Sequence, residues 1–118
     1  MSHPRQIAVV TGSRAEFGLL RPVMQAIAAH PDLGLRVVVT GSHLLSPTTT
    51  IREVQAEFEI VAVVPMQTAG DSGRFADAAA TGRGMAAFAD WLSRERPDVV
   101  LVLGDRIEAF AEIGRAHV

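Results

Sequence analysis

The chain has 118 residues, 48% of them hydrophobic, which is enough for one domain with an ordinary core. Its formal net charge of -2 gives no general attraction to nucleic acid or to an anionic membrane surface, so neither is expected as a partner. The absence of cysteine excludes disulfides and thiolate metal sites, and the lack of a signal-peptide pattern or a long apolar run predicts a cytoplasmic protein.

Two elements open the chain. Residues 7–10 are apolar and mostly β-branched, which is typical of a strand buried on both faces of a parallel sheet. Apolar residues then recur every three or four positions, which predicts an amphipathic helix over residues 17–29. Pro22 is expected in the first turn of this helix, where its missing N–H costs little. The glycine-containing turn before the helix would present N–H groups and a helix N-terminus to an anion.

The rest of the chain continues this alternation of strands and helices. Apolar runs predict strands over residues 35–40, 60–64 and 99–103, helical spacing predicts helices over 51–58 and 74–94, and polar segments predict loops over 41–50 and 69–73. Either Thr49 or Thr50 can cap the first of these helices. Another helix is expected to start at Ile107.

The predicted long helix over residues 74–94 contains two glycines. Gly82 and Gly84 either let another helix approach closely or mark a break. Its phenylalanines, at positions 75 and 88, and Trp91 have helical spacing, so we expect them in the core.

Alternating strands and helices predict an α/β domain, a Rossmann-like parallel sheet with flanking helices. Ligands bind such sheets beyond the carboxyl ends of the strands. Three loops expected at that edge carry glycine and polar residues, over residues 12–18, 41–43 and 104–106. Their coincidence predicts a binding site there.

The common nucleotide fingerprints are missing from these loops. There is no G-x-G-x-x-G motif and no Gly-Lys-Ser/Thr motif, so nicotinamide, flavin and P-loop sites are not expected. No spacing of His, Asp and Glu resembles a metal site. We therefore predict no cofactor and no metal.

Two of the loops supply candidate residues with two open interpretations each. Arg14 is suited to a phosphate and Glu16 adds a carboxylate in the same turn, but the two can equally form a solvated surface pair. His43 follows a strand end, where it can act as an acid, a base or a ligand, or simply be a loop histidine.

The third loop contains Asp105, the sharpest single candidate. It follows an apolar strand and a glycine, and Arg106 and Glu108 bring further charge to the same edge. The alternative is that Asp105 only caps the next helix. The crowding of charge favours a functional role.

Three segments resemble the N-terminal motifs of the UDP-N-acetylglucosamine 2-epimerase family: TGSRAEFGLL at 11–20, VTGSHL at 39–44 and PDVVLVLGDR at 97–106. They stand in the family's order and spacing. The similarity is greatest to the hydrolysing branch, which makes N-acetylmannosamine and UDP for sialic acid synthesis. Leu19 and Arg106 both favour this branch, since the non-hydrolysing branch has lysine and threonine at these positions.

The resemblance implies that residues 1–111 form most of the N-terminal domain of a glycosyltransferase-B type fold, with the C-terminal UDP-binding domain absent from this chain. It implies that UDP leaves as the C2 proton is removed, giving a 2-acetamidoglucal to which water adds with inverted configuration at C2. It also implies roles for six residues: substrate binding by Arg14, Glu16, Gly18 and Arg106, and catalysis by His43 and Asp105.

Residues 112–118 are expected to be a non-native tail, because Gly114 interrupts a helix that should continue and the heptapeptide matches one reading frame of a common sequencing adapter. The full-length parent is expected to be a homo-oligomeric enzyme acting on a UDP-sugar, and this chain to have no turnover alone. Two alternatives stay open: a related substrate such as UDP-diacetylbacillosamine, or a non-catalytic nucleotide- or phosphate-binding flavodoxin-like domain.

Overall fold

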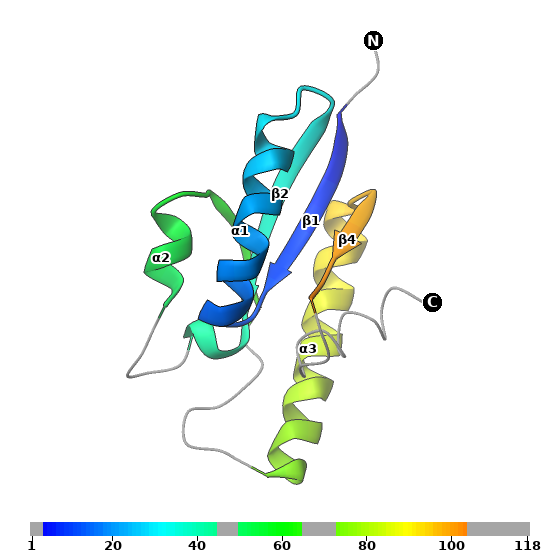
Figure 1. Ribbon diagram of the computed structural model, residues 1–118. Coiled ribbons are helices and arrows are strands. Elements are labelled where there is room, and N and C mark those ends of the chain that lie inside the picture. The colour runs from blue at the N-terminus through cyan, green and yellow to red at the C-terminus, as the bar shows by residue number, and fades with distance from the viewer. Residues whose placement is uncertain (1–3, 45–49, 65–72, 104–118) are drawn as a thin grey trace.

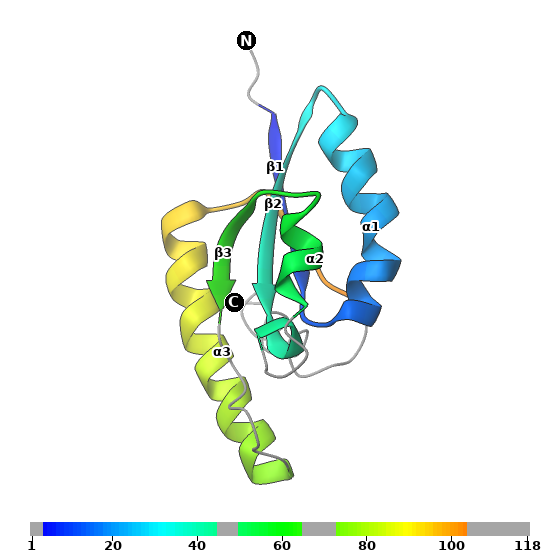
Figure 2. The same ribbon diagram turned by 90° about the vertical axis from the view of Figure 1, so that its left-hand side faces the viewer.

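The computed structural model describes residues 4–44, 50–64 and 73–103. In this part, helices cover both faces of a parallel sheet, as Figure 1 and Figure 2 show. The elements are β1 (Arg5–Thr11), α1 (Arg14–Ala29), β2 (Leu33–Thr40), the 3-10 helix η1 (Gly41–Leu44), α2 (Ile51–Gln55), β3 (Ile60–Val64), α3 (Arg74–Glu95) and β4 (Val99–Leu101). The predicted α/β fold is confirmed.

The sheet has the strand order β3-β2-β1-β4, and every neighbouring pair is parallel. Strand β1 is central, with Val9 in register with Val37 of β2 on one side and with Leu101 of β4 on the other. The chain therefore builds outward to β3 and then returns to the opposite side of β1. The carboxyl end of β1 beside β4 is a topological switch point, the usual place for a ligand in such sheets.

The apolar strands pack on both faces, because alternate side chains of a strand point to opposite sides. One core cluster lies against α3 and contains Ala8, Val10, Val38, Val64, Ala80, Phe88 and Trp91. The other lies against α1 and α2 and contains Val9, Phe17, Leu20, Met24, Ile27, Val37, Val39 and Val54. Double burial explains why the strands read as continuous apolar runs.

Helix α1 begins one turn earlier than predicted. Ser13 is its N-cap, and the Ser13 Oγ accepts the Glu16 N–H at 3.2 Å. The placement of Pro22 in the first turn is therefore wrong, since Pro22 lies well inside the helix. Because proline has no N–H, the carbonyl of Gly18 lacks its usual hydrogen bond within the helix. Gly18 is exposed, so water can bond to this carbonyl instead.

Two short elements also differ from prediction. Helix α2 ends at Gln55, and Thr50 is its N-cap residue, but the Thr50 side chain makes no capping bond. His43 lies in η1, whereas a plain loop was predicted.

Helix α3 runs without a break through Gly82 and Gly84. A methyl group added at Gly82 would meet nothing within 4 Å, so no close approach by the described part of the chain explains this glycine. The prediction that Phe75 packs in the core is wrong, since its side chain is 85% exposed. The first turns of α3 extend past the end of the sheet (Figure 2), so they have no sheet surface to cover. Phe88 and Trp91 are buried as predicted.

No helix in the described ranges combines the length and the apolar character that crossing a membrane requires.

Candidate functional site

The loops that follow β1 and β2 meet at one edge of the sheet. Figure 2 shows η1 and the N-terminus of α1 together at the end where the arrows of β2 and β3 point. Thr11 ends β1, and its Oγ1 lies 2.9 Å from Nε2 of His43. Gly41 has a φ of 63°, which lets the chain turn directly from β2 into η1. The expected convergence of these two loops is thus confirmed.

His43 is completely buried at this edge. Its Nε2 contacts Thr11, its Nδ1 lies 2.6 Å from Oγ1 of Thr50, and its ring meets Phe17 edge to face at 6.4 Å. Both ring nitrogens are therefore occupied, and the imidazole joins β1 and η1 to the residue that precedes α2. Proton exchange with a substrate would require one of these threonine contacts to open.

Burial also sets the charge of this imidazole. It lowers the pKa of His43 below the usual 6.5, because the desolvated ring disfavours the charged form. The charge of Glu53 and the backbone carbonyl of Ser13 act in the opposite direction and are smaller effects. His43 is consequently neutral at pH 7, with one donor and one acceptor nitrogen for its two threonine partners.

Arg14 is the first residue of α1, and its side chain is largely exposed at the same edge. The expected alternative, a pair with Glu16, is wrong: Arg14 Nε lies 3.2 Å from Oε2 of Glu53 on α2. Glu16 is buried instead, and its Oε1 accepts a 3.3 Å hydrogen bond from Ser13 Oγ. The Ser13 hydroxyl thus caps the start of the helix, and the buried Glu16 carboxylate bonds to the same hydroxyl.

Three predicted residues remain, Gly18, Asp105 and Arg106. Gly18 lies in the second turn of α1, exposed and with open space where a Cβ would stand. Asp105 and Arg106 lie outside the described residues. Strand β4 runs parallel to β1 and therefore leads toward the same edge. The functional roles of all six residues stay predictions.

Three residues of this edge were not predicted from sequence. Thr11 and Thr50 hold His43, and Glu53 pairs with Arg14. The position of Thr11 at a strand end was a usable signal, because its hydroxyl must find a partner when buried. Nothing local marked Glu53, whose pairing depends on where α2 lies.

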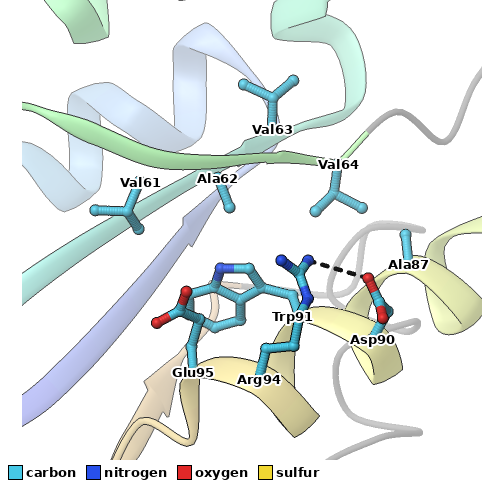
Figure 3. Close-up of a pocket in the computed structure, with 9 residues that line it drawn as sticks. All are labelled: Val61, Ala62, Val63, Val64, Ala87, Asp90, Trp91, Arg94 and Glu95. Atoms are coloured by element: carbon cyan, nitrogen blue, oxygen red, sulfur yellow. Dashed lines mark hydrogen bonds and ion pairs between the residues drawn. The ribbon is translucent and has the colours of Figure 1, made fainter.

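A separate groove lies between β3 and α3 (Figure 3). Its volume is about 300 Å³, and it is lined by Val61, Ala62, Val63, Val64, Ala87, Asp90, Trp91, Arg94 and Glu95. Its charged groups already have partners: Arg94 pairs with Asp90 at 3.0 Å, and Glu95 pairs with Arg36 at 3.4 Å. Of the predicted site residues that the structure describes, none lines this groove, so we place the candidate site at the edge formed by the strand ends.

Within the described ranges, no group of three or more His, Asp or Glu side chains is arranged to hold a metal ion. The chemistry available at the edge is that of a helix N-terminus, an arginine, hydroxyl groups and a buried imidazole. Such a set suits an anionic group more than a metal.

The parallel sheet, with its switch point and the polar groups at the strand ends, defines a Rossmann-like domain. The family model of the UDP-N-acetylglucosamine 2-epimerases matches residues 25–117 of this chain. The chain belongs to this family.

Curated relatives agree with the family match. The chain is 38% identical to a hydrolysing UDP-N,N'-diacetylbacillosamine 2-epimerase of Legionella pneumophila, over 91% of this chain and 29% of that protein. It is 36% identical to a UDP-N-acetylglucosamine 2-epimerase of Neisseria meningitidis, over 91% of this chain and 28% of that protein. The chain thus spans less than a third of the length of these relatives.

Solved structures share the fold. A UDP-N-acetylglucosamine 2-epimerase of Neisseria meningitidis, bound to UDP-N-acetylglucosamine, has a TM-score of 0.73 and 22% identity over 90% of this chain and 27% of its own. Another UDP-N-acetylglucosamine 2-epimerase has a TM-score of 0.80 and 20% identity over 99% of this chain and 30% of its own. The described fold is that of the N-terminal part of a glycosyltransferase-B type enzyme.

Proposed function

We propose that this chain is the N-terminal part of a hydrolysing UDP-N-acetylglucosamine 2-epimerase, which converts UDP-N-acetylglucosamine and water to N-acetylmannosamine and UDP. The main support is that relatives named as 2-epimerases of UDP-sugars match about nine-tenths of the chain. The proposal includes a cytoplasmic, homo-oligomeric parent that supplies sialic acid synthesis, and the absence of turnover by this chain alone.

In this proposal, the start of α1 receives the diphosphate of the substrate. The first N–H groups of a helix have no partner within the helix, and Ser13 satisfies only that of Glu16. Arg14 adds a guanidinium fork at the same place, which suits phosphate oxygens. Gly18 lies one turn further along α1, where the absence of a side chain leaves the approach open.

The chemistry requires stabilisation of a leaving diphosphate and removal of a proton. As the C1–O bond to UDP breaks, negative charge develops on the diphosphate, and Arg14, Arg106 and the helix dipole would stabilise it. Asp105 would accept the C2 proton, leaving a C1=C2 double bond in 2-acetamidoglucal. Water then adds across the double bond: its hydroxyl bonds to C1, and C2 receives a proton on the face opposite to the one that lost its proton, so the configuration at C2 is inverted.

His43 would act on this edge in one of two ways. Its burial and its bonds to two threonines favour a positioning role, in which the neutral ring fixes the end of β1 relative to η1. A direct catalytic role requires the ring to exchange a threonine for substrate. The first arrangement needs no rearrangement of the core.

A related substrate is a second candidate. Two relatives, from Legionella pneumophila and Campylobacter jejuni, are named for the 2-epimerisation of UDP- or GDP/UDP-N,N'-diacetylbacillosamine and are 38% and 36% identical to this chain. The reaction is the same at C1 and C2, and the difference lies in substituents on the sugar.

The test is the product formed by the full-length parent. With UDP-N-acetylglucosamine, we expect UDP and free N-acetylmannosamine in equal amounts. Formation of UDP-N-acetylmannosamine without UDP release would show a non-hydrolysing enzyme. Turnover only with UDP-diacetylbacillosamine would select the second candidate, and UDP-sugar binding with no product from either substrate would favour the non-catalytic binding domain. UDP release by the purified 118-residue chain would refute its proposed inactivity.

A further inference from the structure

Two ion pairs join α1 to the segment that contains α2. Arg14 pairs with Glu53, and Arg21 pairs with Glu57, which follows the end of α2. The rings of Phe17 on α1 and Phe58 of the same segment also meet edge to face at 6.1 Å. The segment is thus fixed against α1 at both ends, and only the pair made by Arg14 lies at the candidate site.

We propose that Glu53 is an internal counter-ion of Arg14 that the anionic ligand must displace, so that Glu53 limits the affinity of the site. The inference rests on the proposed function, since it assumes that Arg14 receives phosphate groups. It assigns a role to a residue of α2 in a site otherwise built from the loops after the strands.

The arrangement of the acidic groups supports this role. Glu16 is only two residues from Arg14, a spacing that does not bring helical side chains together, and it is bonded to the Ser13 hydroxyl. Glu53 instead reaches Arg14 from another element, with its own side chain 45% exposed. The Glu53 carboxylate occupies the Nε side of the Arg14 guanidinium, so a phosphate that uses this side must displace it.

The strength of the pair is suited to displacement. Both side chains are substantially exposed, at 75% for Arg14 and 45% for Glu53. Exposed pairs of this kind contribute little to stability, because solvent screens them and two long side chains must be ordered. A diphosphate carries more charge than one carboxylate and also meets the N-terminus of α1, so it can replace Glu53.

The position of Glu53 also depends on the contact between Thr50 and the buried His43. Thr50 precedes α2 and is bonded to His43, and Glu53 stands three residues later. Helix α2 therefore connects the buried imidazole to the exposed arginine. Displacement of Glu53 releases the side-chain contact without breaking the buried one.

Glu57 provides a matched control. It carries the same charge, pairs with an arginine of the same helix and lies in the same segment, but its partner Arg21 is two turns from the start of α1. Glu57→Gln therefore changes the net charge of the chain as Glu53→Gln does, without freeing Arg14.

The experiment measures binding of inorganic pyrophosphate to the 118-residue chain by isothermal titration calorimetry at low ionic strength. We expect Glu53→Gln to bind about two- to fivefold more tightly than the unmodified chain, which is the range that an exposed ion pair can supply. Glu57→Gln should bind as the unmodified chain does, and Arg14→Gln should bind more weakly. The double variant Arg14→Gln/Glu53→Gln should show no gain over Arg14→Gln.

The other outcomes separate the role of Glu53 from the phosphate-binding role of Arg14. If Arg14→Gln weakens binding but Glu53→Gln does not strengthen it, the role of Glu53 is refuted and the phosphate role of Arg14 stands. An equal gain in Glu57→Gln would refute the specific role of Glu53 and show a general charge effect. If no variant binds pyrophosphate, both the site and the inference are refuted. Thermal unfolding of each variant checks that it is folded.

Discussion

Thr11 and His43 are joined by a 2.9 Å contact between Oγ1 and Nε2, and neither side chain is exposed to solvent. The contact connects the last residue of the central strand to the 3-10 helix that follows its neighbour. With Thr50 on the other ring nitrogen, His43 links three segments of the chain through one neutral ring. The edge on which a ligand is proposed to bind therefore depends on a buried polar contact.

Replacing His43 with alanine should destabilise the domain strongly. The substitution leaves a cavity and removes the partner of two threonine hydroxyls, so we expect a loss of about 2–4 kcal/mol in the free energy of unfolding. Urea unfolding measures it. His30→Ala is the control, because His30 is exposed and should cost less than about 1 kcal/mol. Equal losses in the two variants would contradict the structural role of His43.

Stability should fall in mild acid because of the same ring. Burial lowers the pKa of His43 in the folded state, whereas in the unfolded chain it titrates near 6.5. Between the two values the unfolded state binds more protons, so the free energy of unfolding decreases as the pH falls below about 6.5 and levels off below the folded pKa. Above about 6.5 this residue contributes no pH dependence.

Urea unfolding at pH 7.5 and pH 5.5 tests this dependence. The unmodified chain should lose more stability between these values than His43→Gln, whose side chain does not titrate. If both lose the same amount, other groups cause the pH dependence.

The order of the elements could be predicted because burial on both faces makes strands continuous apolar runs, while helices keep a polar face. The start of α1 was misplaced because apolar periodicity begins after the first turn. The spacing of Ser13 and Glu16 carried the missing signal, since a serine three residues before a glutamate is a sequence signature of a helix start.

The site contacts were less predictable. Arg14 and Glu53 meet only because α2 lies against α1, which depends on tertiary packing. The burial of His43 depends equally on the approach of Thr50, seven residues later. Sequence placed His43 and Arg14 at the correct edge of the sheet but could not give their partners.

Two phenylalanines of α3 should differ sharply in their contribution to stability. Phe88 is fully buried in the cluster between α3 and the sheet, so Phe88→Ala should cost about 3–5 kcal/mol. Phe75 is 85% exposed and contacts the guanidinium of Arg74, so Phe75→Ala should cost less than about 1 kcal/mol. Urea unfolding of the two variants measures the difference. Similar losses would mean that the first turn of α3 is packed in solution.

Two glycines of the same region should respond in opposite directions to alanine. Gly82 lies inside α3, exposed and with open space around the position of a Cβ, so Gly82→Ala should stabilise the domain by about 0.5–1 kcal/mol. Gly73 caps α3 with a φ of 91°, a conformation that L side chains rarely adopt. Gly73→Ala should therefore destabilise the domain by about 1 kcal/mol or more, because alanine must occupy a strained backbone conformation.

Thermal and urea unfolding of both variants, compared with the unmodified chain, give the signs of these changes. Circular dichroism provides a second readout, since Gly82→Ala should raise the helical signal that survives at intermediate denaturant. A loss of stability in Gly82→Ala would mean that another part of the protein packs so closely against Gly82 that no methyl group fits there. Gly82 would then mark the close approach of another helix, which is one of the two interpretations that the sequence left open.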